Sequence, residues 1–320
     1  MATYKEIHGV KVQYRESDAT VIEGDVWYNA SQGKLKMYAA AGSWSTAADV
    51  TTARKVSGSA GITTAALIEG GFGPGGTVQA LSEEYNGTAW TEGSNLQNAR
   101  RYGAGAGTQT AAISAGGNDP SPAKTDTSEE YNGASWAEGN ALNTARENLI
   151  NSMAGAQTAA ILVGGEEPGG AGTLVEKYDG TSWTESDDVP GPMMNTTSLG
   201  TTTACLASLS GEAYTYDGSS WTAIPDSNVS ALDRGGSGTT TAALNWGGAY
   251  PGGSATTETY DGSSWTEVND LNANVYGSGQ GSYGATSSST ISSAGKAGPA
   301  YRAGSEIWDV AATIETIAFD

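Results

Sequence analysis

Cysteine, histidine and phenylalanine are almost absent from this chain of 320 residues, which contains one, one and two of them. The lone cysteine, Cys205, cannot form a disulfide within the chain, and no Cys/His cluster has zinc-site spacing. The lone histidine, His8, lies in a polar segment near the N-terminus. We therefore expect no serine-hydrolase triad, no metal site and no cofactor, and hence no enzyme.

Positive charge is also scarce, with 15 Lys and Arg against 35 Asp and Glu and a net charge of −20. Such a surface repels phosphate backbones and anionic lipids, so we expect no nucleic-acid partner. No apolar run approaches the ~20 residues that cross a bilayer, so we expect no membrane insertion. The opening residues, MATYKEIHGVKVQYRES, are too polar for a cleaved secretion signal.

One aromatic phrase, Tyr-Asn/Asp-Gly-x-x-Trp, occurs five times. It begins at Tyr85, Tyr131, Tyr178, Tyr216 and Tyr260. An Asn-Gly or Asp-Gly pair between strand-forming residues predicts a β-hairpin. In such a hairpin we expect a type I′ turn, with positive φ at both central residues.

The tryptophans of this phrase, together with Trp44, recur at intervals of 46, 46, 47, 38 and 44 residues. A second phrase keeps the same period, as in TAALIEGG from Thr64 and TAAISAGG from Thr110, with a degenerate copy, STISSAGK, from Ser289. Each period predicts four short strands: one of small residues, one ending in a glycine pair, and the aromatic hairpin. No stretch has the 3.6-residue apolar period of a helix.

Side chains grow from glycine and alanine in the first two strands to tyrosine and tryptophan in the last two. Sheets tapered in this way pack into a ring with their narrow edges inward, so we expect an all-β, six-bladed β-propeller. The last blade lacks an outer strand, which residues 42–46 should supply. We predict an N-terminal β arm at residues 1–36, the propeller at 37–309 and a C-terminal tail at 310–320.

The order of these phrases resembles the kelch repeat. In addition, EGDVWYNASQGKLKMY from Glu23, GTQTAAISAGG from Gly107 and EEYNGTAWTEG from Glu83 resemble virion structural proteins of marine tailed bacteriophages. Those proteins are of the tail-fibre or general structural type. The resemblance implies a protein made in the host cytoplasm and incorporated into the virion.

Catalytic alternatives find little support in the residues. Gly262 to Trp265 match half of a sialidase Asp-box, but Tyr260 stands where the box has aspartate, and the ring lacks the histidines that bind copper in galactose oxidase. Four arginines recur at equivalent positions, which favours a structural role in ion pairs with recurring glutamates. The arginines are Arg54, Arg100, Arg146 and Arg234, and the expected partners are Glu84, Glu130, Glu176 and Glu258.

Binding is the remaining function, and long loops are its natural place. Four Pro- and Gly-rich connections follow the glycine pairs and should crowd one face of the ring. Their expected tips carry the candidate binding residues Phe72, Asp119, Glu166, Glu167 and Tyr250. The acidic pairs Glu166-Glu167 and Asp187-Asp188 lack EF-hand spacing, so solvation is favoured over calcium binding.

The sequence thus predicts a non-enzymatic virion protein, in the tail or a fibre, with a loop face for host glycan or protein contact. Its arm should attach it to other virion proteins or to further copies of the chain. Two alternatives stay open at this point: a capsid decoration protein bound to the head, and a glycan-processing propeller enzyme.

Overall fold

The computed structural model describes residues 12–17, 25–55, 58–248, 253–280 and 284–316. These residues form an all-β protein, and η1 (Pro74–Gly76), a single 3-10 turn, is the one helical element among them. Two compact units are present, one of Trp44–Trp308 and one of Met1–Ser43 with Asp309–Asp320. The strands β3 (Lys34–Ala47) and β30 (Ser305–Thr316) run from one unit into the other. No helix of the described residues has the length and apolarity needed to span a bilayer.

The larger unit contains five four-stranded antiparallel sheets, one from each repeat, which we number 1 to 5 in chain order. This confirms four strands per period. Sheet 1 contains β4 (Gly58–Ile62), β5 (Ala65–Phe72), β6 (Val78–Tyr85) and β7 (Trp90–Glu92); sheet 2 contains β8 (Ala104–Thr108), β9 (Ala111–Ala115), β10 (Ser128–Tyr131) and β11 (Trp136–Glu138); sheet 3 contains β12 (Met153–Ala156), β13 (Ala159–Val163), β16 (Val175–Tyr178) and β17 (Trp183–Ser186). Sheet 4 contains β18 (Thr197–Thr201), β19 (Ala204–Leu209), β20 (Glu212–Tyr216) and β21 (Trp221–Ile224), and sheet 5 contains β22 (Gly235–Thr239), β23 (Ala242–Trp246), β24 (Thr257–Tyr260) and β25 (Trp265–Val268).

A six-stranded sheet combines the two ends of the chain in the order β1 (Val12–Arg15), β2 (Val26–Asn29), β3, β30, β27 (Ser289–Ser293) and β26 (Gly279–Gln280), and we call its last four strands sheet 6. Within the larger unit, the Ser45 hydroxyl donates to the Ile307 carbonyl oxygen at 3.4 Å. The side-chain amide of Asn272 donates to the Trp44 carbonyl oxygen at 3.2 Å. The corresponding amide of Asn228 makes the same bond to Trp265, in the outer strand of sheet 5, also at 3.2 Å. Trp44 therefore holds the place of an outer-strand tryptophan in sheet 6.

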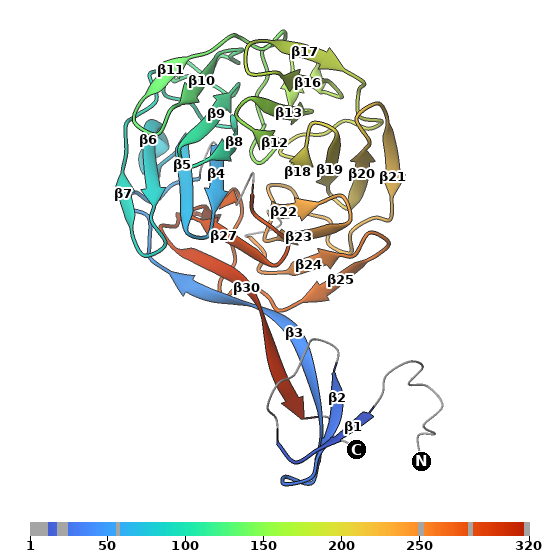
Figure 1. The fold of residues 1–320 in the computed structure, drawn as a ribbon. Helices are drawn as coiled ribbons and strands as arrows, with labels where there is room; N and C mark the ends of the chain where they lie inside the picture. The colour runs from blue at the N-terminus through green and yellow to red at the C-terminus, as the bar shows by residue number, and fades with distance from the viewer. Residues whose placement is uncertain (1–11, 18–24, 56–57, 249–252, 281–283, 317–320) are drawn as a thin grey trace. The chain divides into compact units, whose positions relative to one another are not determined.

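The first strand of every sheet contacts the first strand of the next. These contacts join β4 to β8, β8 to β12, β12 to β18, β18 to β22, β22 to β26 and β26 back to β4. Figure 1 shows the sheets fanned around a common axis, a propeller-like arrangement. Small residues permit the close approach, because a Cβ on Gly58 of β4 would lie 2.6 Å from the Gly105 nitrogen of β8. The placement of the small-residue strands at the axis is confirmed.

The aromatic phrase forms the expected hairpin but not the expected turn. Tyr85 pairs with Trp90, which leaves a four-residue loop between them. The Asn86 side-chain oxygen accepts hydrogen bonds from the backbone N–H groups of Thr88 and Ala89, each at 2.9 Å. Only Gly87 has a positive φ, of 89°. The type I′ prediction is wrong because the Asn or Asp side chain closes a longer loop as an Asx turn.

Each tyrosine of the phrase packs on its own tryptophan and against the sheet before it. Tyr131 and Trp136 lie 5.0 Å apart between ring centroids and join a buried cluster with Ala60 and Leu67 of sheet 1. Each ring buries roughly 150–250 Å², which contributes on the order of 4–6 kcal/mol of gross hydrophobic free energy. The recurring aromatic pair is therefore the main apolar filling between neighbouring sheets.

The smaller unit contains two short strands besides part of β3. β1 (Val12–Arg15) pairs in parallel with β2 (Val26–Asn29), which pairs antiparallel with β3. The Trp27 side chain is fully buried, with the Arg15 guanidinium 5.3 Å from its ring centroid. The lone histidine, His8, lies outside the described residues.

Candidate functional site

Phe72 is the last residue of β5, so its predicted place at a loop tip is wrong. The tip of this loop is formed by η1. The Phe72 ring is half-buried and has its centroid 6.4 Å from that of Tyr102 and 6.2 Å from that of Tyr301. The other predicted aromatic binding residue, Tyr250, lies outside the described residues.

Two of the three predicted acidic residues, Asp119 and Glu167, bond within their own loops, whereas Glu166 bonds to a side chain of the neighbouring sheet 2 connection. The Asp119 carboxylate accepts hydrogen bonds from the hydroxyl and the N–H of Ser121 at 2.7 and 2.8 Å. Glu166, in the short hairpin of β14 (Glu166–Glu167) and β15 (Gly170–Ala171), accepts from the Lys124 ammonium at 2.9 Å. The Glu167 carboxylate accepts from the Leu174 N–H at 3.3 Å. Among the described residues no group of three or more His, Cys, Asp or Glu side chains could hold a metal ion.

All four recurring arginines form buried ion pairs within their own sheets, with side chains no more than 4% exposed. Arg100 lies 2.9 Å from Glu129, Arg146 lies 2.7 Å from Glu176, Arg234 lies 2.6 Å from Glu258, and Arg54 pairs with Glu83. Two of the expected partners, Glu176 and Glu258, are confirmed.

The prediction is wrong for Glu84 and Glu130, because the arginines pair with the preceding residues, Glu83 and Glu129. Neighbouring residues of a strand face opposite sides, so the carboxylates of Glu84 and Glu130 point to the next sheet instead of the arginine. There Glu84 accepts a hydrogen bond from the Tyr131 hydroxyl, and Glu130 accepts one from the Tyr178 hydroxyl. Burial and the Glu84 carboxylate raise the pKa of the Tyr131 hydroxyl to about 12.

The buried glutamates also fasten the segment that joins one sheet to the next. Glu129 accepts hydrogen bonds from the backbone N–H groups of Gln97 and Asn98, at 2.7 and 3.1 Å. Glu258 accepts likewise from the N–H of Asn228 at 2.7 Å. The ion pairs thus hold each of their sheets to the segment that joins it to the sheet before it.

One cluster that the sequence reasoning missed combines aromatic rings with cations from sheets 6, 1 and 2. We call it the aromatic–cation patch and define it as Lys55, Phe72, Arg101, Tyr102, Tyr276, Lys296 and Tyr301. The Arg101 guanidinium lies 5.0 Å from the ring centroid of Phe72 and 5.3 Å from that of Tyr102. The Lys55 ammonium lies 5.3 Å from the Tyr102 centroid.

The other three residues of the patch, Tyr276, Lys296 and Tyr301, come from sheet 6 and its connections. Lys55 also lies 5.4 Å from the Tyr276 ring centroid, and Lys296 lies 5.0 Å from that of Tyr301. Burial raises the pKa of the Tyr301 hydroxyl, and the neighbouring Tyr102 and Tyr276 add to the effect. The sequence signal for this patch is a pair of cations just before an innermost strand, as in Arg54-Lys55 and Arg100-Arg101. The first arginine of each pair is buried, and the cation after it is only half-buried.

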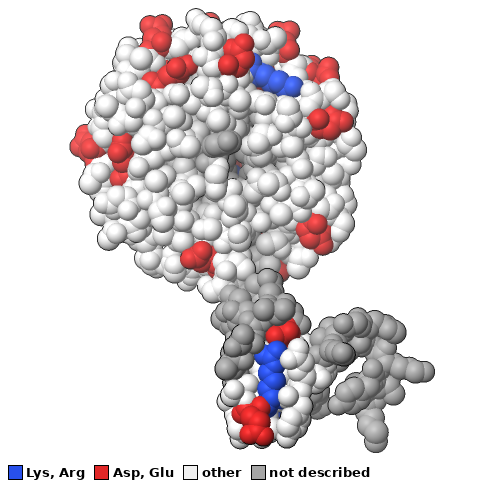
Figure 2. All heavy atoms as spheres, viewed as in Figure 1, with Lys and Arg blue, Asp and Glu red and all other residues white. Residues whose placement is uncertain are grey.

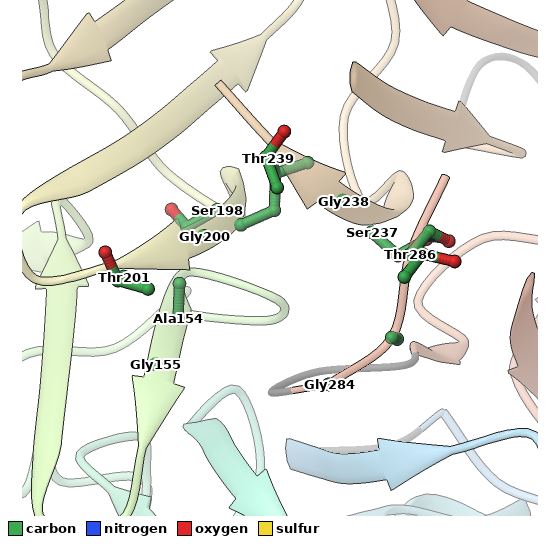
Figure 3. Close-up of a pocket in the computed structure, with 12 residues that line it drawn as sticks. Ala154, Gly155, Ser198, Gly200, Thr201, Ser237, Gly238, Thr239, Gly284 and Thr286 are labelled. Carbon is green, nitrogen blue, oxygen red and sulfur yellow. Dashed lines mark hydrogen bonds between the residues drawn. The ribbon is translucent and has the colours of Figure 1, made fainter. Parts of the chain in front are cut away.

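A small cavity of about 220 Å³ lies at the opposite ends of the inner strands β12, β18 and β22. Figure 3 shows its lining, which includes Ser198, Thr201, Ser237, Thr239 and Thr286. Its described lining consists of small neutral residues and Leu199, with hydroxyls but no charged group. The lining therefore offers hydrogen bonds but no acid, base or thiol nucleophile.

Glu69 is a buried acid that the sequence did not single out. It lies on β5, is 1% exposed, and its carboxylate oxygens accept no hydrogen bond from the described residues. Burial raises the pKa of this carboxyl to about 7, although the positive charge of Arg100 partly offsets the effect. The group therefore titrates near neutral pH in the folded protein.

We expect Glu69→Gln to stabilise the protein at pH 8 by up to about 3 kcal/mol and to change little at pH 4. Because the folded pKa of about 7 exceeds the ordinary value of 4.5, wild-type stability is full below pH 4.5 and falls as pH rises through 7. Urea unfolding at both pH values measures the difference, with the exposed Glu92→Gln as the control. An equal effect of Glu69→Gln at the two pH values would contradict this linkage.

No protein-family model matches this chain, and no curated protein matches it. Solved structures do match: one titled "Structure of YjhT" superposes with a TM-score of 0.65 and 10% sequence identity. The match covers 83% of this chain and 98% of the other. At this identity the likeness establishes the all-β, propeller-like fold alone.

Proposed function

We propose that the larger unit is a six-bladed, kelch-like propeller whose last blade is completed by the N-terminal segment at residues 42–46. Two observations support this: the inner strands contact one another in a cycle, and Trp44 accepts the Asn272 bond that outer-strand tryptophans accept in other sheets. In this proposal residues 37–309 form the ring, residues 1–36 an attachment arm, and residues 310–320 a tail.

We further propose that the protein is a non-enzymatic part of a bacteriophage particle, in its tail or a fibre, and contacts the host surface. The aromatic–cation patch is the observation that carries the recognition role, because it presents rings and unpaired charge where long loops meet on a rigid scaffold. The resemblance of its phrases to virion proteins supports the place in the particle.

Attachment to other virion proteins would use the smaller unit. Its side chains Val12, Tyr14 and Tyr28 are 44%, 72% and 39% exposed, and the two tyrosine rings stack at 5.9 Å. Grouped exposed apolar side chains are typical of surfaces that a partner protein covers.

Electron cryomicroscopy of the phage that encodes this chain tests the location. We expect density that fits the six-sheet ring on the tail or its fibres. Density on the capsid would overturn the tail assignment in favour of a head decoration protein.

Adsorption of the purified protein to host cells tests the recognition role. We expect Phe72→Ala to weaken adsorption at least tenfold, because the patch loses its central ring. The control Ile62→Ala truncates another exposed apolar side chain, at the far end of β4, and should change adsorption less than twofold. Equal adsorption of both variants, with unchanged melting curves, would remove the patch from the function.

A further inference from the structure

We infer that the aromatic–cation patch binds an acidic polysaccharide and recognises the carboxylates of its sugars. This inference rests on the proposed role in host contact and names the class of ligand. It is carried by the distribution of cations, by their pairing and by the rings beside them.

Cations in the larger unit are few and unevenly distributed. Of the ten Lys and Arg between residues 44 and 308, four are the buried arginines of the ion pairs. Lys177 belongs to the outer part of the ring, where it donates to the Tyr216 hydroxyl at 2.7 Å. The other five lie just before the innermost strands or in the connections between second and third strands: Lys55, Arg101, Lys124, Lys296 and Arg302.

These five cations differ in whether they form an ion pair with a carboxylate. Lys124 lies 2.9 Å from Glu166, Arg302 lies 3.8 Å from Glu306, and Lys55 lies 2.6 Å from Asp233. Arg101 and Lys296 have no carboxylate partner among the described residues. Two half-buried cations without counter-charges, on a chain of net charge −20, form a local site for an anion.

Figure 2 shows one face of the molecule, where Asp and Glu side chains follow the perimeter of the larger unit and few Lys or Arg appear. A ligand of dense negative charge would be repelled by such a perimeter. Duplex DNA carries one charge for about each 1.7 Å of axis, whereas the carboxylates of an acidic polysaccharide are separated by whole sugar rings. The patch therefore suits a sparsely charged anion.

The rings indicate a sugar as the carrier of the carboxylate. Phe72, Tyr102 and Tyr301 are half-buried. The Phe72 ring centroid lies 6.4 Å from that of Tyr102 and 6.2 Å from that of Tyr301, so the three rings form a continuous aromatic surface. Aromatic faces pack against apolar surface, which the C–H faces of sugar rings provide, while tyrosine hydroxyls serve sugar hydroxyls. The Arg101 guanidinium, held over two rings, keeps a planar fork of N–H donors for a carboxylate.

Binding of an end-labelled decagalacturonate to the full chain, followed by fluorescence anisotropy at low salt, tests the inference. We expect saturable binding that Arg101→Gln/Lys296→Gln weakens at least tenfold and that 0.5 M NaCl weakens strongly. The control Lys34→Gln/Lys177→Gln removes the same charge elsewhere and should weaken binding less than twofold. Arg101→Lys/Lys296→Arg keeps both charges and should stay within about threefold of wild type.

The comparison ligands decide the class. A neutral galactan of the same length should bind at least tenfold more weakly, and so should a deca-glutamate peptide. Equal binding of the galactan would overturn the role of charge, and equal binding of the peptide would overturn the role of the sugar. No binding of decagalacturonate at millimolar concentration, with unchanged melting curves, would overturn the inference altogether.

Cell adsorption separates this inference from the proposed function. Adsorption without decagalacturonate binding would reject the acidic polysaccharide and leave host contact standing. Decagalacturonate binding without adsorption would support the ligand class and reject host contact.

Discussion

Replacing Arg146 with methionine is expected to lower the free energy of unfolding by about 3–5 kcal/mol. The substitution leaves the fully buried Glu176 carboxylate without its counter-charge, which lies 2.7 Å away in the wild type. It also removes the donor to the carbonyl oxygens of Gly164 and Leu174, at 2.8 and 2.9 Å. Urea unfolding measures the loss. The control is Glu185→Gln, an exposed cross-strand neighbour of Glu176, which should change stability by less than about 0.5 kcal/mol.

The chain contains a natural replacement of this pair in sheet 4. The carbonyl oxygen of Met193 accepts a bond from Gly165 at 2.6 Å, as that of Arg146 accepts one from Gly117 at 2.8 Å, so Met193 takes the arginine position. Tyr214 stands two residues before the sheet tyrosine, where sheet 3 has Glu176. Both charges are thus replaced together by residues that pack in one apolar cluster.

The double variant Arg146→Met/Glu176→Tyr should therefore be more stable than the sum of the single losses predicts. We expect a coupling of at least about 1 kcal/mol in a double-mutant cycle, because neither buried charge is left alone. Additive losses would show that the two side chains contribute independently.

Truncation of Trp44 to alanine should lower the free energy of unfolding by about 3–5 kcal/mol. The indole is 7% exposed, and its ring centroid lies 5.3 Å from Trp246 and 5.5 Å from Trp308. Its N–H donates to the Thr257 hydroxyl at 2.9 Å. Trp44→Phe keeps most of the ring contact but loses this bond, so a smaller loss of about 1–2 kcal/mol is expected.

Deletion of residues 1–48 removes the whole of β3 and should abolish cooperative unfolding, since sheet 6 loses an entire strand. Deletion of residues 1–33 removes β1 and β2 but keeps β3, and it should leave a sharp melting transition. Calorimetry of both variants is the measurement. A sharp, unshifted transition after the longer deletion would contradict completion of the ring by this segment.

Local patterns predicted the fold well, since the strands, the hairpins and the inner position of the glycine-rich strands depend on residues near one another in the chain.

The predictions were wrong where a shift of one residue, or one side chain, decides an ion-pair partner or a turn type. Glu83 and Glu84 are both glutamates at the end of β6, and the sequence does not say which faces Arg54. Likewise Asn86 is compatible with two turn types, and its side-chain bonds decide between them.

The candidate site was less predictable for a physical reason. The sequence predicts Phe72 as a loop aromatic, but its aromatic neighbours Tyr102 and Tyr301 come from sheets 2 and 6. Arg101 directly follows the recurring Arg100, and nothing in the sequence separates it from that motif. Only the propeller-like arrangement of the sheets brings these residues together, and no spacing in the sequence encodes that.

Because β3 pairs with β30, the N-terminal strand cannot find its partner until the end of translation. Ser45 and Ile307, which hydrogen-bond across these strands, are 262 residues apart. At translation rates of about 5–20 residues per second, the N-terminal strand leaves the ribosome roughly 13–52 s before its partner is made. During that interval the nascent chain carries an unpaired strand edge, which can pair with another chain. Aggregation in the cell should therefore decrease when this edge is covered until translation ends.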